Sequence, residues 1–188
     1  GGFSTVYKIR KADDETGMFC SALKVVTIPQ NPDEYQTLRE DGYTEEDITT
    51  IFKDQLNTIV SEFKMMAQFR GMTNIVSYED HMIVPHDDGQ GWDVLIRMEL
   101  LKALPMFINE KGVLSEEETI RMGKDICKAL EICASKNIIH RDIKPQNIFV
   151  NEYGDYKLGD FGVARIMDHT THATKIGTYG YIAPEVYN

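Results

Sequence analysis

The side chains best suited to catalysis lie in one polar octet, His140-Arg141-Asp142-Ile143-Lys144-Pro145-Gln146-Asn147. Two further motifs follow it: Asp160-Phe161-Gly162 begins eighteen residues after Asp142, and Ala183-Pro184-Glu185 lies near the end of the sequence. Carboxylates and amides supply the hard oxygen ligands that Mg²⁺ prefers, and a carboxylate can accept a proton from a hydroxyl. The Asp-Phe-Gly triplet alone occurs often by chance, but the three motifs in this order and at these intervals form a specific pattern.

The pattern resembles the protein kinases, and in particular their Ser/Thr branch. The resemblance covers the whole chain, from a glycine-rich loop to the end of the activation segment. It implies an α+β, bilobal fold with an antiparallel-sheet N-lobe plus helix and an incomplete, mostly helical C-lobe. It also implies transfer of the γ-phosphoryl group of ATP to Ser or Thr hydroxyls of a protein substrate.

The resemblance assigns roles to four polar residues of the C-lobe. Asp142 matches the residue that orients the attacking hydroxyl and accepts its proton. Lys144 would reach the transferred phosphate, and Asn147 and Asp160 match the family's two Mg²⁺-binding side chains. The catalytic residues are therefore expected to be Asp142, Lys144 and Asn147, with Asn147 and Asp160 as metal ligands.

In the N-lobe, Lys24 resembles the lysine that holds the α- and β-phosphates of ATP. An isolated lysine in a mostly apolar strand is normally an edge residue with its ammonium group in water. The expected partner is Glu62, which precedes Asn74 by the family's usual interval, so we predict a Lys24–Glu62 ion pair. The 38 residues between Lys24 and Glu62 exceed the usual separation because an acidic insertion lies between them.

The resemblance also implies a nucleotide-binding set around the glycine-rich loop and the hinge. Gly1 and Gly2 match the second half of the phosphate-covering loop, but Ser4 stands at the third glycine position, where a β-carbon narrows the backbone's freedom. The backbone of Glu99 and Leu101 would pair with adenine, beside Met98 at the back pocket. The residues that would sandwich the adenine ring are Val6, Ala22 and Phe149, the last in place of the commoner leucine.

Regulation is expected in the activation segment. Thr178 lies seven residues before Glu185, where Ser/Thr kinases place a threonine that bonds the catalytic Asp and Lys. Arg141, beside Asp142, implies control by a phosphate that pairs with its guanidinium group. The candidate phosphorylation sites, in order of preference, are Thr174, Thr171 and Thr170.

The hydrophobic pattern predicts the elements that hold these residues. Strands are expected over 5–10, 18–28, 75–82 and 94–100, and a loop over 29–43. Thr44 with Asp47 predicts the start of one long helix or of two consecutive helices. Ser115 with Glu118 predicts a capping box that opens a helix ending near Lys136. Its expected buried stripe is Ile120, Ile126, Cys127, Leu130 and Cys133.

These elements predict an N-lobe over 1–101 and a partial C-lobe over 102–188. The N-lobe lacks its first strand, carries the acidic insertion at about 29–57 and includes the hinge at 98–101. Four residues match the family's regulatory spine: Met66, Tyr78, His140 and Phe161. His140 is expected to be buried and hydrogen-bonded rather than catalytic, whereas His81, His169 and His172 have no metal-ligand companions and are expected to be solvated.

The composition of the chain argues against several other classes of function. The chain has 188 residues and a formal net charge of −10, which argues against nucleic-acid binding because that needs a basic face. Eight acids against two bases fall between residues 31 and 60, a pattern typical of a solvated face. No apolar run approaches the ~18 residues of a membrane span. Three cysteines leave one unpaired, which favours a reduced, cytoplasmic setting.

Two alternatives stay open. One is a small-molecule phosphotransferase with a related Asp…Asn loop, which Lys144, Thr178 and the Ala-Pro-Glu motif disfavour. The other is a catalytically inactive, kinase-like binding module, for which Ser4 is the main support. The sequence reads as a piece of a longer protein, so an efficient parent enzyme with an inactive fragment is also possible.

Overall fold

The computed structural model describes residues 4–17, 19–166 and 177–187. The chain folds as two compact units, of which the first comprises Gly1–Arg70 and Ser77–Leu100 and the second Gly71–Val76 and Leu101–Asn188. Residues 71–76, which the sequence-based division placed in the N-lobe, therefore belong to the second unit. None of the described helices combines the length and apolar character needed to cross a membrane.

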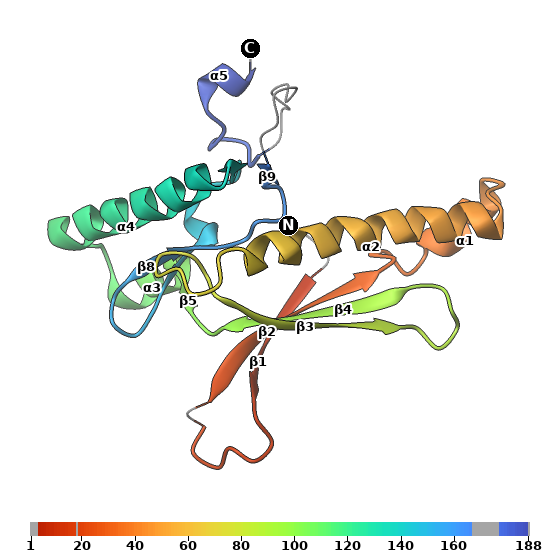
Figure 1. Ribbon diagram of the computed structural model, residues 1–188, viewed down its shortest axis with the longest axis horizontal. Coiled ribbons are helices and arrows are strands. Elements are labelled where there is room, and N and C mark those ends of the chain that lie inside the picture. The colour runs from red at the N-terminus through yellow and green to blue at the C-terminus, as the bar shows by residue number, and fades with distance from the viewer. Residues whose placement is uncertain (1–3, 18, 167–176, 188) are drawn as a thin grey trace. The chain divides into compact units, whose positions relative to one another are not determined.

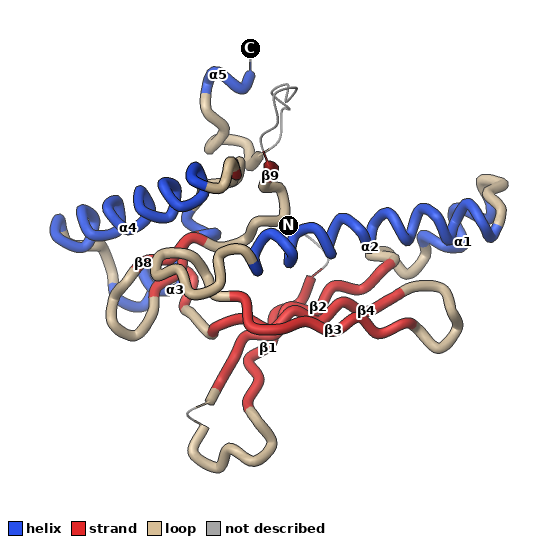
Figure 2. The backbone as a smooth tube through the Cα atoms, viewed as in Figure 1, coloured by secondary structure: helices blue, strands red, loops and turns tan. Residues whose placement is uncertain are grey.

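The first unit contains a four-stranded antiparallel sheet in the order β1-β2-β4-β3 (Figures 1 and 2). The strand bounds are β1 Ser4–Arg10, β2 Cys20–Ile28, β3 Tyr78–Pro85 and β4 Trp92–Glu99. The predicted strands are present, although β3 begins three residues later than expected. Ile28, Val94 and Ile96 are fully buried on one face of the sheet, which explains why these strands are rich in β-branched residues.

Helix α2, Glu45–Ala67, runs along that sheet as one continuous helix (Figure 1). Thr44 caps its start in the predicted box with Asp47: the Asp47 amide donates to the Thr44 hydroxyl oxygen at 3.2 Å, and the Thr44 amide donates to the Asp47 carboxylate at 3.0 Å. The buried side chains recur at helical spacing, so one face of α2 packs on the sheet. They are Ile48, Phe52, Ile59, Phe63 and Met66.

The loop prediction for residues 29–43 is wrong in its centre, where Glu34–Glu40 forms helix α1. This helix buries no side chain, so it leaves no hydrophobic period in the sequence. Polar contacts attach it to α2 instead. Gln55 donates to Glu34 at 2.7 Å, Tyr35 donates to Glu45 at 2.7 Å, and Arg39 pairs with Glu45 at 3.1 Å.

The second unit combines helices with short strands. The helices are α3 Leu104–Lys111, α4 Glu116–Ser135, the 3-10 turn η1 Pro145–Asn147 and α5 Pro184–Tyr187. One sheet has the order β5-β7-β8, with strands Lys102–Ala103, Ile148–Val150 and Tyr156–Leu158, and β6 Ile138–Ile139 pairs with β9 Arg165–Ile166. Ile75 adds a parallel bridge to Leu158, which attaches residues 71–76 to this unit.

Helix α4 begins at the predicted capping box, with Ser115 as N-cap and Glu118 as its partner, and ends at Ser135. Its predicted stripe is wrong at two positions, because Ile120 is 51% exposed and Cys127 is exposed. Cys133 is buried, and burial raises the pKa of its thiol to about 11. Packing therefore explains Cys133, as predicted, but not Cys127.

Candidate active site

The predicted catalytic octet begins directly after β6 and is anchored by His140, which is 2% exposed. The Asp142 amide donates to His140 Nδ1 at 3.3 Å, so Nε2 carries the proton and donates to the Gly159 carbonyl at 2.9 Å. The ring also meets Phe161 edge-on, with centroids 4.8 Å apart. Burial lowers the pKa of His140, which favours the neutral ring. As predicted, His140 is buried and hydrogen-bonded, and it links the octet to the Asp160 motif.

The Asp142 carboxylate is held by groups from two segments. Oδ1 accepts the Thr178 amide at 3.0 Å and the Thr178 hydroxyl at 2.6 Å, while Oδ2 lies 2.7 Å from Lys144 Nζ and 3.0 Å from Asn147 Nδ2. Partial burial alone would raise the pKa of Asp142, but the bonds from Lys144, Thr178 and Asn147 outweigh it and lower the pKa. The group is therefore an ionised, fixed acceptor at neutral pH.

Lys144 and Thr178 meet directly, since Lys144 Nζ donates to Thr178 Oγ1 at 2.6 Å. This contact and the two bonds from Thr178 to Asp142 confirm the prediction that Thr178 bonds both residues. Asp142 and Lys144 thus form one closed cluster with Thr178, which lies 36 and 34 residues further along the chain. The cluster ties the segment after residue 176 to the octet.

Asn147 and Asp160 are brought close by the backbone. The Gly159 amide donates to the Asn147 carbonyl at 2.9 Å, which places Asp160 beside the end of the octet. The Asn147 side chain uses its amide nitrogen on Asp142, so its amide oxygen faces away from that carboxylate. Asp160 is exposed. One carboxylate and one amide oxygen fit Mg²⁺, which takes few protein ligands when phosphates supply the others.

The described residues contain no cluster of three or more His, Cys, Asp or Glu side chains that could hold a metal ion by itself. The fit of Asn147 and Asp160 therefore depends on a phosphate-bearing ligand that completes the coordination shell. Asp160 has a left-handed backbone, with φ of 59°, an uncommon conformation for a residue other than glycine. Such a conformation is a local strain of the kind that proteins retain at functional sites.

Gly159 is a site residue that sequence reasoning missed. A β-carbon there would lie 2.7 Å from Val76 Cγ2 and 2.9 Å from Phe149 Cε2, so only glycine fits between these side chains. The close approach lets the Gly159 amide and carbonyl bond the octet on both sides of Asp142. A single glycine before an Asp-Phe-Gly triplet carries no signal in one sequence, because the requirement comes from packing.

Arg141 lies beside the cluster with a left-handed φ of 65°, and its Nε donates to the Val163 carbonyl at 2.6 Å. Burial, together with the like charge of Arg165, lowers the pKa of Arg141. Two guanidinium groups that repel one another favour an anion near both. Arg165 was not among the predicted residues, because the two arginines are 24 positions apart in sequence and β9 brings them together.

In the first unit, Lys24 and Glu62 form the predicted ion pair at 2.8 Å. Their side chains are only 19% and 12% exposed, so neither is an ordinary surface charge. Lys24 projects from the middle of β2 and Glu62 from the last turns of α2. A half-buried ammonium group fixed in this way can hold an anionic ligand with little loss of side-chain entropy.

The predicted adenine contacts are distributed over both units, and their roles stay predictions. Ala22 is 7% exposed and pairs with Met98 across β2 and β4. The Glu99 amide donates to Ser77, and the Glu99 carboxylate accepts the Ser77 amide, which fixes the end of β4. Val6 is 61% exposed on β1. Leu101 and Phe149 are half-buried in the second unit, and Gly1 and Gly2 lie outside the described residues.

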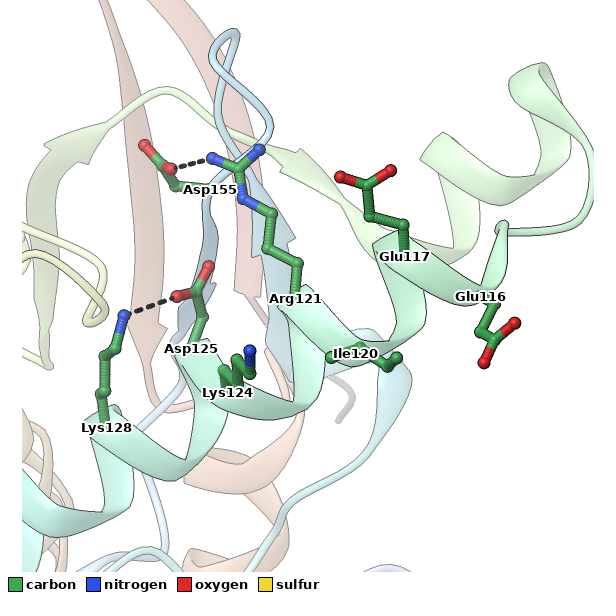
Figure 3. A pocket seen from close by; sticks show the side chains of 8 residues that line it. All are labelled: Glu116, Glu117, Ile120, Arg121, Lys124, Asp125, Lys128 and Asp155. Carbon is green, nitrogen blue, oxygen red and sulfur yellow. Dashed lines mark hydrogen bonds and ion pairs between the residues drawn. The ribbon is translucent and has the colours of Figure 1, made fainter.

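One pocket in the second unit contains none of the predicted site residues (Figure 3). It lies on α4 and the turn before β8, with Ile120 among charged side chains. Arg121 pairs with Asp155 at 2.5 Å and Lys128 with Asp125 at 3.3 Å. Most of its charges are therefore neutralised within the chain, and the Arg121–Asp155 pair attaches α4 to the β7–β8 turn.

Each unit thus holds a polar constellation suited to phosphoryl transfer, a lysine–glutamate pair in one and a carboxylate–lysine–threonine cluster in the other. The family described as protein kinase domain matches residues 1–188. The chain belongs to the protein kinase domain family. This also confirms the predicted fold class.

Several curated relatives are named as Ser/Thr kinases. A probable serine/threonine-protein kinase of Clostridium perfringens is 46% identical over 87 residues, which are 45% of this chain and 13% of that protein. Human serine/threonine-protein kinase Nek2 is 31% identical over 159 residues, which are 78% of this chain and 35% of that protein. CBL-interacting serine/threonine-protein kinase 5 of Arabidopsis thaliana is 29% identical over a match that covers 98% of this chain and 37% of that protein. The chain therefore spans at most 37% of the length of these relatives.

Proposed function

We propose that the whole protein is an ATP- and Mg²⁺-dependent Ser/Thr protein kinase. The observation that carries the proposal is the Asp142 carboxylate, fixed by Lys144 and Thr178 in a member of the protein kinase domain family. An ionised carboxylate in a rigid hydrogen-bonded cluster is suited to orient a hydroxyl nucleophile. The names of the relatives support Ser and Thr as acceptors.

In the proposed reaction, Asp142 accepts a hydrogen bond from the substrate hydroxyl and takes its proton. The hydroxyl oxygen forms a bond to the γ-phosphorus while the bond from that phosphorus to the β–γ bridging oxygen breaks, so that ADP leaves. Lys144 neutralises charge on the phosphoryl oxygens, which grows in the transition state. Its position beside Asp142, 2.7 Å from Oδ2, supports this role.

Asn147 and Asp160 are the residues that would hold Mg²⁺. When bound, the ion neutralises phosphate charge and orients the phosphates for in-line attack. Lys24, held by Glu62, is proposed to bind the α- and β-phosphates. The backbone of Glu99 and Leu101, with Val6, Ala22, Met98 and Phe149, is proposed to bind adenine, and Gly1 and Gly2 to cover the phosphates.

The proposed activity is tested with the full-length protein, ATP and Mg²⁺. We expect transfer of labelled γ-phosphate to peptides whose only acceptor is Ser or Thr, and none to the same peptides with Tyr. Small alcohols and amines offered in place of the peptide serve as the comparison substrates. Transfer to those small molecules, or ATP binding without any transfer, would contradict the proposal.

We further propose that phosphorylation of the activation segment controls the enzyme, through Arg141 and Arg165. The support is the mutual repulsion of these guanidinium groups, which a phosphate would relieve by charge-assisted bonds to both. The candidate sites, Thr170, Thr171 and Thr174, lie outside the described residues. Thr178 itself should stay unmodified, because a phosphate there would repel Asp142.

Replacing Thr170, Thr171 and Thr174 together with alanine should lower the activity of the full-length enzyme. The physical reason is that the two arginines then lack the anion that orders the segment before Thr178. Peptide mapping of active enzyme should locate phosphate on at least one of the three residues. Full activity of the triple variant would contradict this mode of control.

The setting of the protein is proposed to be cytoplasmic. The three cysteines are free thiols rather than disulfides, and they differ in burial, from exposed Cys127 to buried Cys133. A chain that keeps free thiols suits a reducing compartment.

A further inference from the structure

Three residues form one row across the sheet of the first unit. Lys24 on β2 pairs with Ile96 on β4, and Ile96 pairs with His81 on β3. Residues that are directly opposite in neighbouring strands project to the same face. Ile96 is fully buried at the centre of the row, with Lys24 and His81 on its two sides.

Helix α2 contacts both ends of this row through two consecutive residues. Glu62 pairs with Lys24 at 2.8 Å, and Phe63 stacks on His81 with ring centroids 4.0 Å apart and an interplanar angle of 29°. Figure 1 shows α2 running along the sheet. The ionic contact and the aromatic contact therefore hold the same turn of the helix.

The His81 ring is itself held in place. Its Nδ1 lies 2.5 Å from the Tyr78 hydroxyl, and Tyr78 is 6% exposed. Arg70 stacks over the Tyr78 ring, with its guanidinium carbon 5.3 Å from the centroid, and donates to the Tyr78 carbonyl at 3.4 Å. His81 is thus exposed on one side and packed on the other, with an orientation set by Tyr78.

The position of the helix matters because the 2.8 Å contact forms only when the Glu62 carboxylate lies directly beside the Lys24 ammonium group. An α-helix turns once in about 3.6 residues, so rotation or translation that moves Phe63 also moves Glu62. Fixing the Phe63 ring therefore fixes the direction from which the Glu62 carboxylate reaches Lys24.

We propose that His81 is a positioning residue for the Lys24–Glu62 ion pair. Its stacked ring holds α2 so that Glu62 meets Lys24, and the Tyr78 hydroxyl holds the ring. His81 acts through Phe63, on which its ring is stacked. The inference rests on the proposed kinase function, in which Lys24 orients the phosphates of ATP.

The first test measures steady-state kinetics of full-length variants. His81→Ala removes the stack and should lower kcat roughly tenfold, as for neighbouring coupled residues, with a smaller change in the KM for ATP. His81→Phe keeps an aromatic ring on Phe63 and should recover most of the turnover. Tyr78→Phe removes only the hydroxyl and should fall between them. Met82→Ala, 61% exposed on the opposite face of β3, is the matched control and should behave as wild type.

The second test is a double-mutant cycle. If His81 acts through the ion pair, adding His81→Ala to Lys24→Met should not reduce the residual turnover any further. The same addition should still lower the melting temperature. A purely structural role would instead give additive losses of turnover. The inference is overturned if the losses of turnover are additive, or if His81→Ala keeps full turnover while Lys24→Met loses most of it. Either result leaves the kinase function intact. A wild-type protein without kinase activity overturns the proposed function itself.

Discussion

Replacing Asp142 with asparagine should lower the turnover of the full-length protein by roughly 10²–10⁴-fold, the usual range for loss of a general base. Asparagine keeps the size of the side chain, and its one amide oxygen can still accept the bonds from Thr178, although an NH2 group then replaces the oxygen that meets Lys144. It cannot take the proton of the attacking hydroxyl. The fold and the ATP affinity should therefore be kept while kcat falls, which steady-state kinetics with a Ser or Thr peptide and calorimetry with ATP will measure.

The matched control for this change is Asp87→Asn. Asp87 lies in the exposed turn between β3 and β4, where the same loss of one negative charge should leave turnover unchanged. A melting temperature close to that of the wild type would show that Asp142→Asn folds. Near-normal turnover of a folded Asp142→Asn enzyme would contradict the role of Asp142 as the base.

Features that depend on residues close together in the sequence were mostly predicted correctly. The capping boxes at Thr44 and Ser115 specify helix starts through bonds between residues three apart, and both are present. The alternating apolar strands and the motif residues were also predicted. The Lys24–Glu62 pair was predicted only because the family interval names Glu62, since nothing else in a single sequence connects residues 38 positions apart.

Other features depend on packing and were not predictable. Helix α1 is held by polar contacts with α2, so it shows no hydrophobic period. On α4, Ile120 and Cys127 are apolar but exposed, because the helix buries a narrower face than hydrophobicity suggests, one that includes Asp125. Asp125 is tolerated there since it accepts the Tyr156 amide at 3.2 Å. His81 is exposed, as expected, but its stack on Phe63 arises from strand register and could not be predicted.

The Arg141–Arg165 arrangement shows the same limit within the candidate site. The octet predicts Arg141, but its neighbour comes from β9, whose pairing with β6 is a tertiary feature. Gly159 likewise becomes informative only when the distances to Val76 and Phe149 are known. Motifs thus identify the chemical groups, whereas the environment that tunes them comes from segments that the motifs do not include.

Replacing Lys24 with methionine should lower turnover by roughly 10²–10³-fold, comparable to the loss of one group that stabilises transition-state charge. Methionine has a similar length and no charge, so the position in β2 stays filled while the ammonium group that meets Glu62 is lost. Binding of ATP should weaken much less, because the hinge backbone and the apolar side chains are proposed to supply much of the affinity. Calorimetry with ATP and single-turnover kinetics with a peptide will separate the two effects.

Glu62→Gln is the companion variant that distinguishes phosphate binding from charge balance. It removes the negative charge but keeps an oxygen that can accept a bond from Lys24, so turnover should fall less than with Lys24→Met. Lys53→Met, at an exposed position of α2, is the matched control for loss of a lysine and should keep normal kinetics. If Lys24→Met eliminated ATP binding yet spared turnover at saturating ATP, Lys24 would be a binding residue only. The Lys24–Glu62 pair would then not orient the phosphates for transfer.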